Sequence, residues 1–185
     1  MLKKLISTLA LSLCLGSSAI AQTDIKFTLG WKTQGSDAPF LLAMQKGYFK
    51  EEGLNVMIDQ GEGSAATVTR IMSGVYDAGF GDINAIIQNA ATRPNEVPVM
   101  VYQLWSKPPF AIVSKKETNI TKPSDLEGKK LGGAQGTPTT RLVTVLGSIN
   151  KVDMTKVAIE NMGPNLQEPM LIKGDIDGAL VFSIT

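Results

Sequence analysis

Short apolar runs alternate with amphipathic, helix-like segments along most of the chain. Apolar runs that predict β-strands occupy residues 25–29, 54–58, 76–80 and 97–104. Helical periodicity, with small or polar residues at the starts, covers residues 37–45, 64–74 and 82–91. The order β-α-β-α-β-α-β predicts a parallel sheet with helices on both faces, which is the α/β class.

Two prolines in SKPPF interrupt this pattern, and residues 106–109 are predicted to form a stiff crossover because proline fixes the backbone φ angle. A second series of elements follows. Strands are expected near 110–113, 131, 157–159 and 178–182, and helices near 138–146 and 167–172. The pattern predicts two lobes, 22–105 and 110–185, with a cleft between them for a small ligand.

The N-terminus resembles a secretory signal peptide. MLKK is a short basic start, LISTLALSLCLG is an apolar run too short to span a bilayer comfortably, and Ala19-Ile20-Ala21 fits the cleavage rule. We expect residues 1–21 to be removed and the mature protein to be periplasmic. Cys14 lies inside this run after Leu13, so a lipid anchor is not expected.

Composition narrows the chemistry further. The chain has no histidine and no cysteine besides Cys14, which argues against disulfides, thiolate metal sites and histidine-dependent catalysis. It has 18 basic and 17 acidic residues. Cleavage after Ala21 would remove Lys3 and Lys4, which leaves 16 basic against 17 acidic residues and a net charge of −1. This balance argues against nucleic-acid binding. We expect no catalytic residue, no metal, no cofactor and no enzymatic activity.

The stretch GEGSAATVTRI at 61–71 matches G-x-G-x-x-[GA], the turn that holds a dinucleotide pyrophosphate. However, it follows the second strand rather than the first, and export separates the protein from the cytoplasmic nicotinamide pool. The same turn suits one wall of a solute cleft, because small residues let the backbone approach a ligand and helix-end amides donate hydrogen bonds to its anionic or carbonyl oxygens. The candidate residues are Gly61, Gly63, Ser64 and Ala65.

Other candidates lie in loops after strands, where open α/β sheets bind their ligands. Trp31 either stacks on a planar ligand or caps the sheet, and helix capping alone would explain Asp37 and Asp82. The second lobe offers a threonine-rich turn as a polar or anion cradle. The full set comprises Trp31, Asp37, Phe40, Gly81, Asp82, Gln135, Gly136, Thr137, Thr139 and Thr140.

Three blocks carry a family resemblance: WKTQGSDAPFLLAMQKGYFKEEGLNVMID, GEGSAATVTRIMSGVYDAGFGD and KPSDLEGKKLGGAQGTPTTR. They resemble the periplasmic solute-binding proteins of ABC importers, and within them the NMT1/THI5-like group, which handles nitrate, sulfonates, taurine and thiamine- or riboflavin-type heterocycles. The resemblance implies a type II two-lobed fold and a monomer that captures a solute, closes about the crossover and docks on a membrane permease.

The resemblance leaves the ligand open. The aromatic residues near the loops favour a thiamine- or pyrimidine-type heterocycle, whereas the threonine-rich turn fits a sulfonate, taurine or nitrate equally well. Relatives often carry histidine where this chain has Asp37, and a carboxylate there favours an amino or cationic group on the ligand. A THI5-like pyrimidine-synthesising enzyme is the alternative class, disfavoured by the lack of histidine.

The resemblance also bears on length. Relatives usually continue well beyond position 185 and return to the first lobe. We therefore expect the sequence to be a fragment with an incomplete second lobe, an uncovered sheet edge and uncovered apolar faces.

Overall fold

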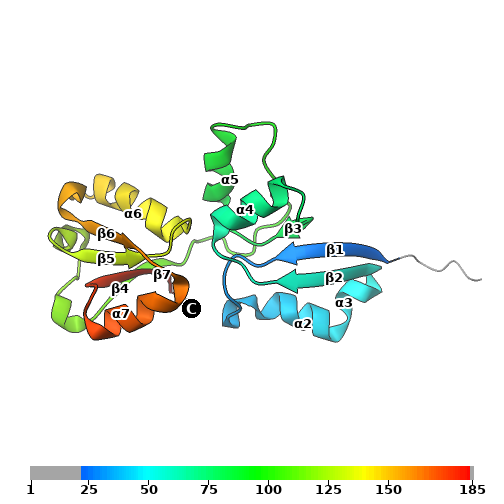
Figure 1. The fold of residues 1–185 in the computed structure, drawn as a ribbon, viewed down its shortest axis with the longest axis horizontal. Helices are drawn as coiled ribbons and strands as arrows, with labels where there is room; N and C mark the ends of the chain where they lie inside the picture. Colours follow the sequence, from blue (N-terminus) through cyan, green and yellow to red (C-terminus); the bar gives the residue numbers. More distant parts are fainter. Residues whose placement is uncertain (1–21, 184–185) are drawn as a thin grey trace, which may run out of the picture.

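The computed structural model describes residues 22–183 and contains two α/β lobes side by side (Figure 1). The predicted signal peptide lies outside the described residues. Each lobe is one sheet with helices on both faces, and the extended segment 98–109 leads from the first lobe to the second. The α/β class with largely parallel sheets is therefore confirmed.

The first lobe has a three-stranded parallel sheet of order β2-β1-β3. Its α2 and α3 cover one face, and α4 and α5 lie on the other side (Figure 1). The elements are β1 Thr23–Thr28, η1 Gly35–Asp37, α2 Ala38–Lys46, α3 Tyr48–Glu51, β2 Leu54–Asp59, α4 Ser64–Met72, β3 Ala78–Gly79 and α5 Ile83–Ala90.

The second lobe has a four-stranded sheet of order β4-β7-β5-β6, with α6 and α7 on opposite faces. Strand β4 runs antiparallel to β7, whereas β5 is parallel to both β6 and β7. The elements are β4 Phe110–Ser114, η2 Lys116–Thr118, η3 Pro123–Leu126, β5 Lys130–Gly133, α6 Pro138–Ile149, η4 Met154–Lys156, β6 Ala158–Asn161, η5 Pro164–Leu166, α7 Gln167–Lys173 and β7 Gly178–Phe182.

The strand predicted at 97–104 is wrong. This segment is irregular in the structure, and Val99 and Val101 are 84% and 91% exposed. A strand needs a hydrogen-bonded neighbour, and no described strand lies beside this segment. The predicted strand 76–80 is likewise reduced to Ala78–Gly79, which pairs only with the end of β1.

The helix starts follow the predictions only in part. Asp82 caps α5, because its Oδ1 accepts the amide of Asn84 at 2.9 Å. Neither Asp37 nor Ser64 caps an α-helix through its side chain, and Asp37 contributes only to the capping box at the start of η1. The Asp37 carboxylate accepts the Gln34 amide instead, and the Ser64 hydroxyl accepts the Asp82 amide.

The two lobes differ in how much apolar surface they bury. In the second lobe, one cluster of buried side chains centres on Leu131 and Leu180, and another lies under α7 around Ile176. In the first lobe, the fully buried apolar residues among those described are Leu29, Val68 and Ala85. Within residues 22–183, no helix combines the length and apolarity that crossing a membrane requires.

Candidate functional site

The loops that follow β1, β2 and β3 are joined into one platform at the carboxyl ends of the strands. The amide of Gly61 donates to Trp31 O at 2.8 Å, and the amide of Gly63 donates to Gly30 O at 2.9 Å. The amide of Asp82 then donates to the hydroxyl of Ser64 at 2.9 Å. The glycine turn is therefore held in place by both neighbouring loops.

A chamber of about 630 Å³ is lined by residues of this platform and by residues 98–105. Four rings form a row along it: centroids of Phe27 and Phe40 are 5.2 Å apart, those of Phe40 and Phe80 5.1 Å, and those of Phe80 and Trp105 5.1 Å. Phe110 and Phe182 add a contacting pair from the second lobe, with centroids 5.3 Å apart. Such walls suit a flat, largely apolar ligand.

Asp37 is the buried carboxylate of this chamber. It is 3% exposed and lines the cavity beside Phe40. Burial raises the pKa of its carboxyl, and the hydrogen bond from the Gln34 amide, at 3.0 Å to Oδ2, opposes that shift. Among the described residues, none donates a hydrogen bond to Oδ1. Oδ1 is not among the fully buried atoms without a partner, and the residue lines the chamber, so this oxygen is available to a hydrogen-bond donor on a ligand.

The threonine-rich turn of the second lobe is bonded internally. The hydroxyl of Thr137 donates to Ala134 O at 2.8 Å, and that of Thr140 donates to the same oxygen at 3.0 Å. The hydroxyl of Thr139 donates to Leu180 O at 3.3 Å. These hydroxyls stabilise the turn and join it to β7, so the three hydroxyl donors of the predicted anion cradle are already engaged.

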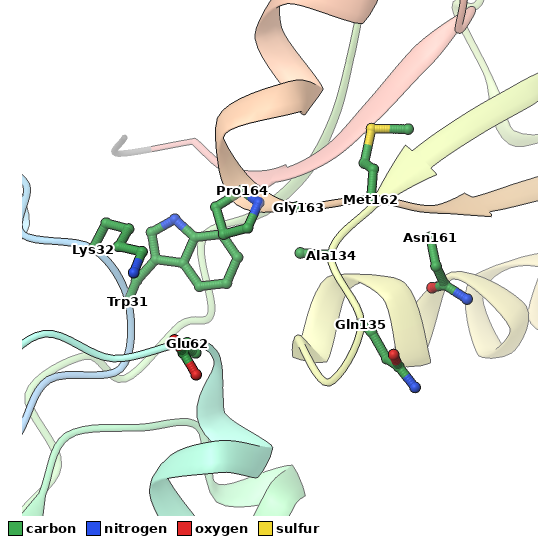
Figure 2. A pocket seen from close by; sticks show the side chains of 9 residues that line it. All are labelled: Trp31, Lys32, Glu62, Ala134, Gln135, Asn161, Met162, Gly163 and Pro164. Carbon is green, nitrogen blue, oxygen red and sulfur yellow. The ribbon is translucent and has the colours of Figure 1, made fainter.

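A smaller cavity of about 390 Å³ lies between the lobes (Figure 2). Figure 2 shows Trp31, Lys32 and Glu62 on the side of the first lobe, facing Ala134, Gln135 and residues 161–164 of the second. Trp31 lines both this cavity and the chamber. Glu62 is paired with Arg70 at 3.3 Å, so Lys32 contributes the free charge of this pocket among its lining residues.

The structure brings together most of the residues proposed from the sequence. Those that line the chamber are Trp31, Asp37, Phe40, Gly63, Ser64, Gly81, Asp82 and Thr137. Gln135 lines the smaller cavity with Trp31. Those that line neither cavity are Gly61, Ala65, Gly136, Thr139 and Thr140. Ligand contact by any of them remains a prediction.

Gly61 shows why a glycine in the motif need not touch a ligand. A β-carbon at this position would collide with the backbone of Leu29 and Gly30, so glycine is required by the close approach of two loops. Gly136 and Ala65 meet each other across the lobes instead.

Within residues 22–183, no cluster of three acidic, cysteine or histidine side chains is placed to hold a metal ion.

Sequence reasoning missed Phe27 and Gln34 as lining residues. Phe27 and Ile25 are two residues apart on β1, with the exposed Lys26 between them, so the period of two along the strand places both on the same, partly buried face. Phe27 contacts Phe40 of helix α2. No comparable signal marks Gln34, whose place depends on the η1 turn.

The fold is that of the periplasmic solute-binding proteins of ABC importers. The chain matches the alkanesulfonate-binding protein SsuA of Xanthomonas axonopodis pv. citri, bound to MOPS, with a TM-score of 0.67 and 16% identity. That match covers 88% of this chain and 56% of the other. A histidine-bound ABC uptake transporter substrate-binding protein of Streptococcus pneumoniae matches with a TM-score of 0.60 and 19% identity, covering 87% and 66% of the two chains.

Within that fold, the chain belongs to the NMT1/THI5-like family, whose family model matches residues 34–185. It is 32% identical over 160 residues to the 4-amino-5-hydroxymethyl-2-methylpyrimidine phosphate synthase of Aspergillus parasiticus, covering 84% of this chain and 45% of the relative. It is 26% identical over 150 residues to the synthase of that name from Legionella pneumophila, covering 80% and 46%. The chain thus spans about half the length of the curated relatives it matches.

These relatives correct one expectation. We expected no enzymatic activity, and that expectation is contradicted because the curated relatives carry the names of synthases. The expectation depended on the lack of histidine and on the resemblance to solute-binding proteins. Missing one residue type excludes only the chemistry that needs it, and says nothing of reactions carried by other groups.

Proposed function

We propose that the chamber binds a planar, amino-substituted nitrogen heterocycle of the aminopyrimidine type. Asp37 is the observation that carries this proposal: a buried carboxyl whose Oδ1 is open to a ligand donor, placed beside a row of aromatic rings. A carboxyl group pairs with the amino group of such a ring, and the aromatic walls bury its faces. The names of the curated relatives support the same ligand class.

We further propose that this binding serves solute capture in the periplasm and delivery to an ABC-type importer. The fold neighbours and the signal-peptide pattern of residues 1–21 support that role. In this proposal the ligand enters between the lobes, contacts both, and is enclosed by rotation about the crossover. A sulfonate, taurine or nitrate is the alternative ligand, and in the smaller cavity the Lys32 ammonium and the Gln135 amide would bind it.

Binding of 4-amino-5-hydroxymethyl-2-methylpyrimidine, measured by calorimetry on the full-length protein, tests the ligand class. We expect the wild type to bind and D37N to bind at least about tenfold more weakly, since losing a hydrogen bond to a charged or buried group costs about 1.5–3 kcal/mol. D24N, a change at an exposed carboxylate of the same lobe, should bind like the wild type. Binding of taurine or nitrate with no response to the pyrimidine would refute the proposal.

Synthesis of a pyrimidine phosphate is a second candidate function, favoured by the names of the curated relatives. Mass spectrometry separates the two. A transport protein isolated from its own cells releases an unchanged solute on denaturation. A synthase accumulates new pyrimidine phosphate when the protein is incubated in cell extract.

A further inference from the structure

We propose that the turn at Gly136 and the start of α4 form a backbone latch that positions the second lobe against the chamber. The latch consists of Gly63, Ala65 and Gly136. The amide of Ala65 donates to Gly136 O across the lobes at 3.3 Å. Figure 1 shows the lobes meeting where α4 and α6 begin. Testing the latch by ligand affinity rests on the proposed function, whereas testing it by the distance between the lobes does not.

The latch requires small residues on both sides. A β-carbon on Gly136 would lie 3.2 Å from the β-carbon of Ala65, and one on Gly63 would lie 3.4 Å from Gly136 O. Gly63 and Gly136 also have φ angles of +108° and +79°, which side chains rarely adopt. Larger residues at these positions would hold the two backbones apart.

Both halves of the latch are fixed before they meet. In the first lobe, Gly63 is bonded to Gly30, and Ser64 is bonded to Asp82. In the second lobe, the hydroxyls of Thr137 and Thr140 both donate to Ala134 O, which sets the turn that presents Gly136. The contact therefore joins two ordered turns, and little backbone freedom is lost when it forms.

The amide of Ala65 belongs to the first turn of α4, where amides have no acceptor within the helix. A carbonyl of the other lobe occupies the position that sequence reasoning assigned to a ligand oxygen. Thr137 and Pro138 follow Gly136 directly and line the chamber beside Gly63 and Ser64. The latch residues are thus positioning residues: they place Thr137 and Pro138 of the second lobe at the wall of the chamber.

Gly136→Ala tests the latch, and Gly128→Ala is its matched control. Gly128 has the same φ angle of +79° in the same lobe, but an added β-carbon there meets nothing within 4 Å. Both variants should lose similar thermal stability from backbone strain. Only G136A should also displace the lobes.

The displacement is measured without ligand, from the distance between spin labels on Q45C in α2 and S148C in α6, in a C14S background. Both label sites are exposed. We expect a longer and broader distance distribution for G136A than for the parent, and an unchanged one for G128A. If G136A does not fold, A65V tests the same contact from the first lobe, with A66V as its control. Equal distributions in latch and control variants would overturn the proposal.

Affinity for 4-amino-5-hydroxymethyl-2-methylpyrimidine provides the second readout. We expect roughly tenfold weaker binding by G136A and unchanged binding by G128A. If the wild type does not bind this compound, the proposed ligand is wrong, while the label distances still decide whether the latch exists. Displaced lobes with unchanged affinity would show that the contact does not position the ligand wall.

Discussion

At the scale of single residues, the Asp37 carboxyl is the proposed binding group, and its burial lowers the stability of the folded chain. Burial raises the pKa of its carboxyl, so the folded chain holds the proton more tightly than the unfolded chain does. The unfolded chain then binds fewer protons in that range, and the free energy of unfolding falls as pH rises. The fall begins near the ordinary pKa of 3.8 and is complete above the raised value.

We therefore expect D37N to be more stable than the wild type at pH 7, with a melting temperature higher by about 2–4 °C. Its amide oxygen can still accept the Gln34 amide, but nothing is ionised. Thermal unfolding measured from pH 3.5 to 7 checks this, and the gain should shrink as the pH is lowered. D24N should match the wild type. A melting temperature for D37N below that of the wild type across the whole range would contradict the argument.

At the scale of elements, α4 packs directly on the sheet through Gly79. A β-carbon there would lie 2.7 Å from Cγ2 of Thr67 and 2.9 Å from Cγ2 of Thr28. The Thr67 hydroxyl also donates to Leu29 O at 3.3 Å. The helix that carries the glycine turn is thereby held at a short distance from β1 and β3, which places the turn at the chamber.

We expect G79A to destabilise the protein by about 1–3 kcal/mol through overpacking. T67S removes the methyl group and keeps the hydroxyl, so the double variant G79A/T67S should recover part of the loss. Denaturant unfolding of the four proteins gives the coupling energy, which we expect to be about 0.5–1.5 kcal/mol and favourable. Purely additive effects would mean that α4 does not limit the space at Gly79.

The sequence predicts elements well where the pattern is local. The α6 and α7 helices and strands β2, β4 and β7 lie close to their predicted ranges, because apolar periodicity and glycine or proline boundaries mark them. The segment 97–104 has the composition of a strand but no described neighbour to pair with, and pairing is not a local property. The antiparallel direction of β4 is likewise set by its partner β7.

The candidate site shows the same limit. Polar loops at strand ends were found from their positions, and eight of these residues line the chamber. Which hydroxyls and amides remain available was not predictable, since that depends on partners far along the chain. Ser64 bonds to Asp82, Thr139 bonds to Leu180, and the amide of Ala65 bonds to Gly136.

At the scale of the whole molecule, the lobes should differ in stability. The second lobe buries Leu126, Leu131 and Val143 in one cluster, whereas helix α2 of the first lobe has no fully buried residue. Local opening costs less free energy where fewer apolar side chains are buried. The lobe that carries most of the chamber walls is thus the lobe held together by less apolar packing.

Native-state hydrogen exchange tests this difference. We expect amides of β5 and β7 to be the most protected and those of β1 and β2 to exchange with a lower opening free energy. Leu131 is fully buried, so L131A should cost about 2–5 kcal/mol and speed exchange in β5, β6 and β7. Exchange in β1 should stay unchanged if the lobes open separately. Equal protection of both sheets, together with an equal response to L131A, would mean that the two lobes unfold as one cooperative unit. The latch would then couple the stability of the lobes as well as their positions.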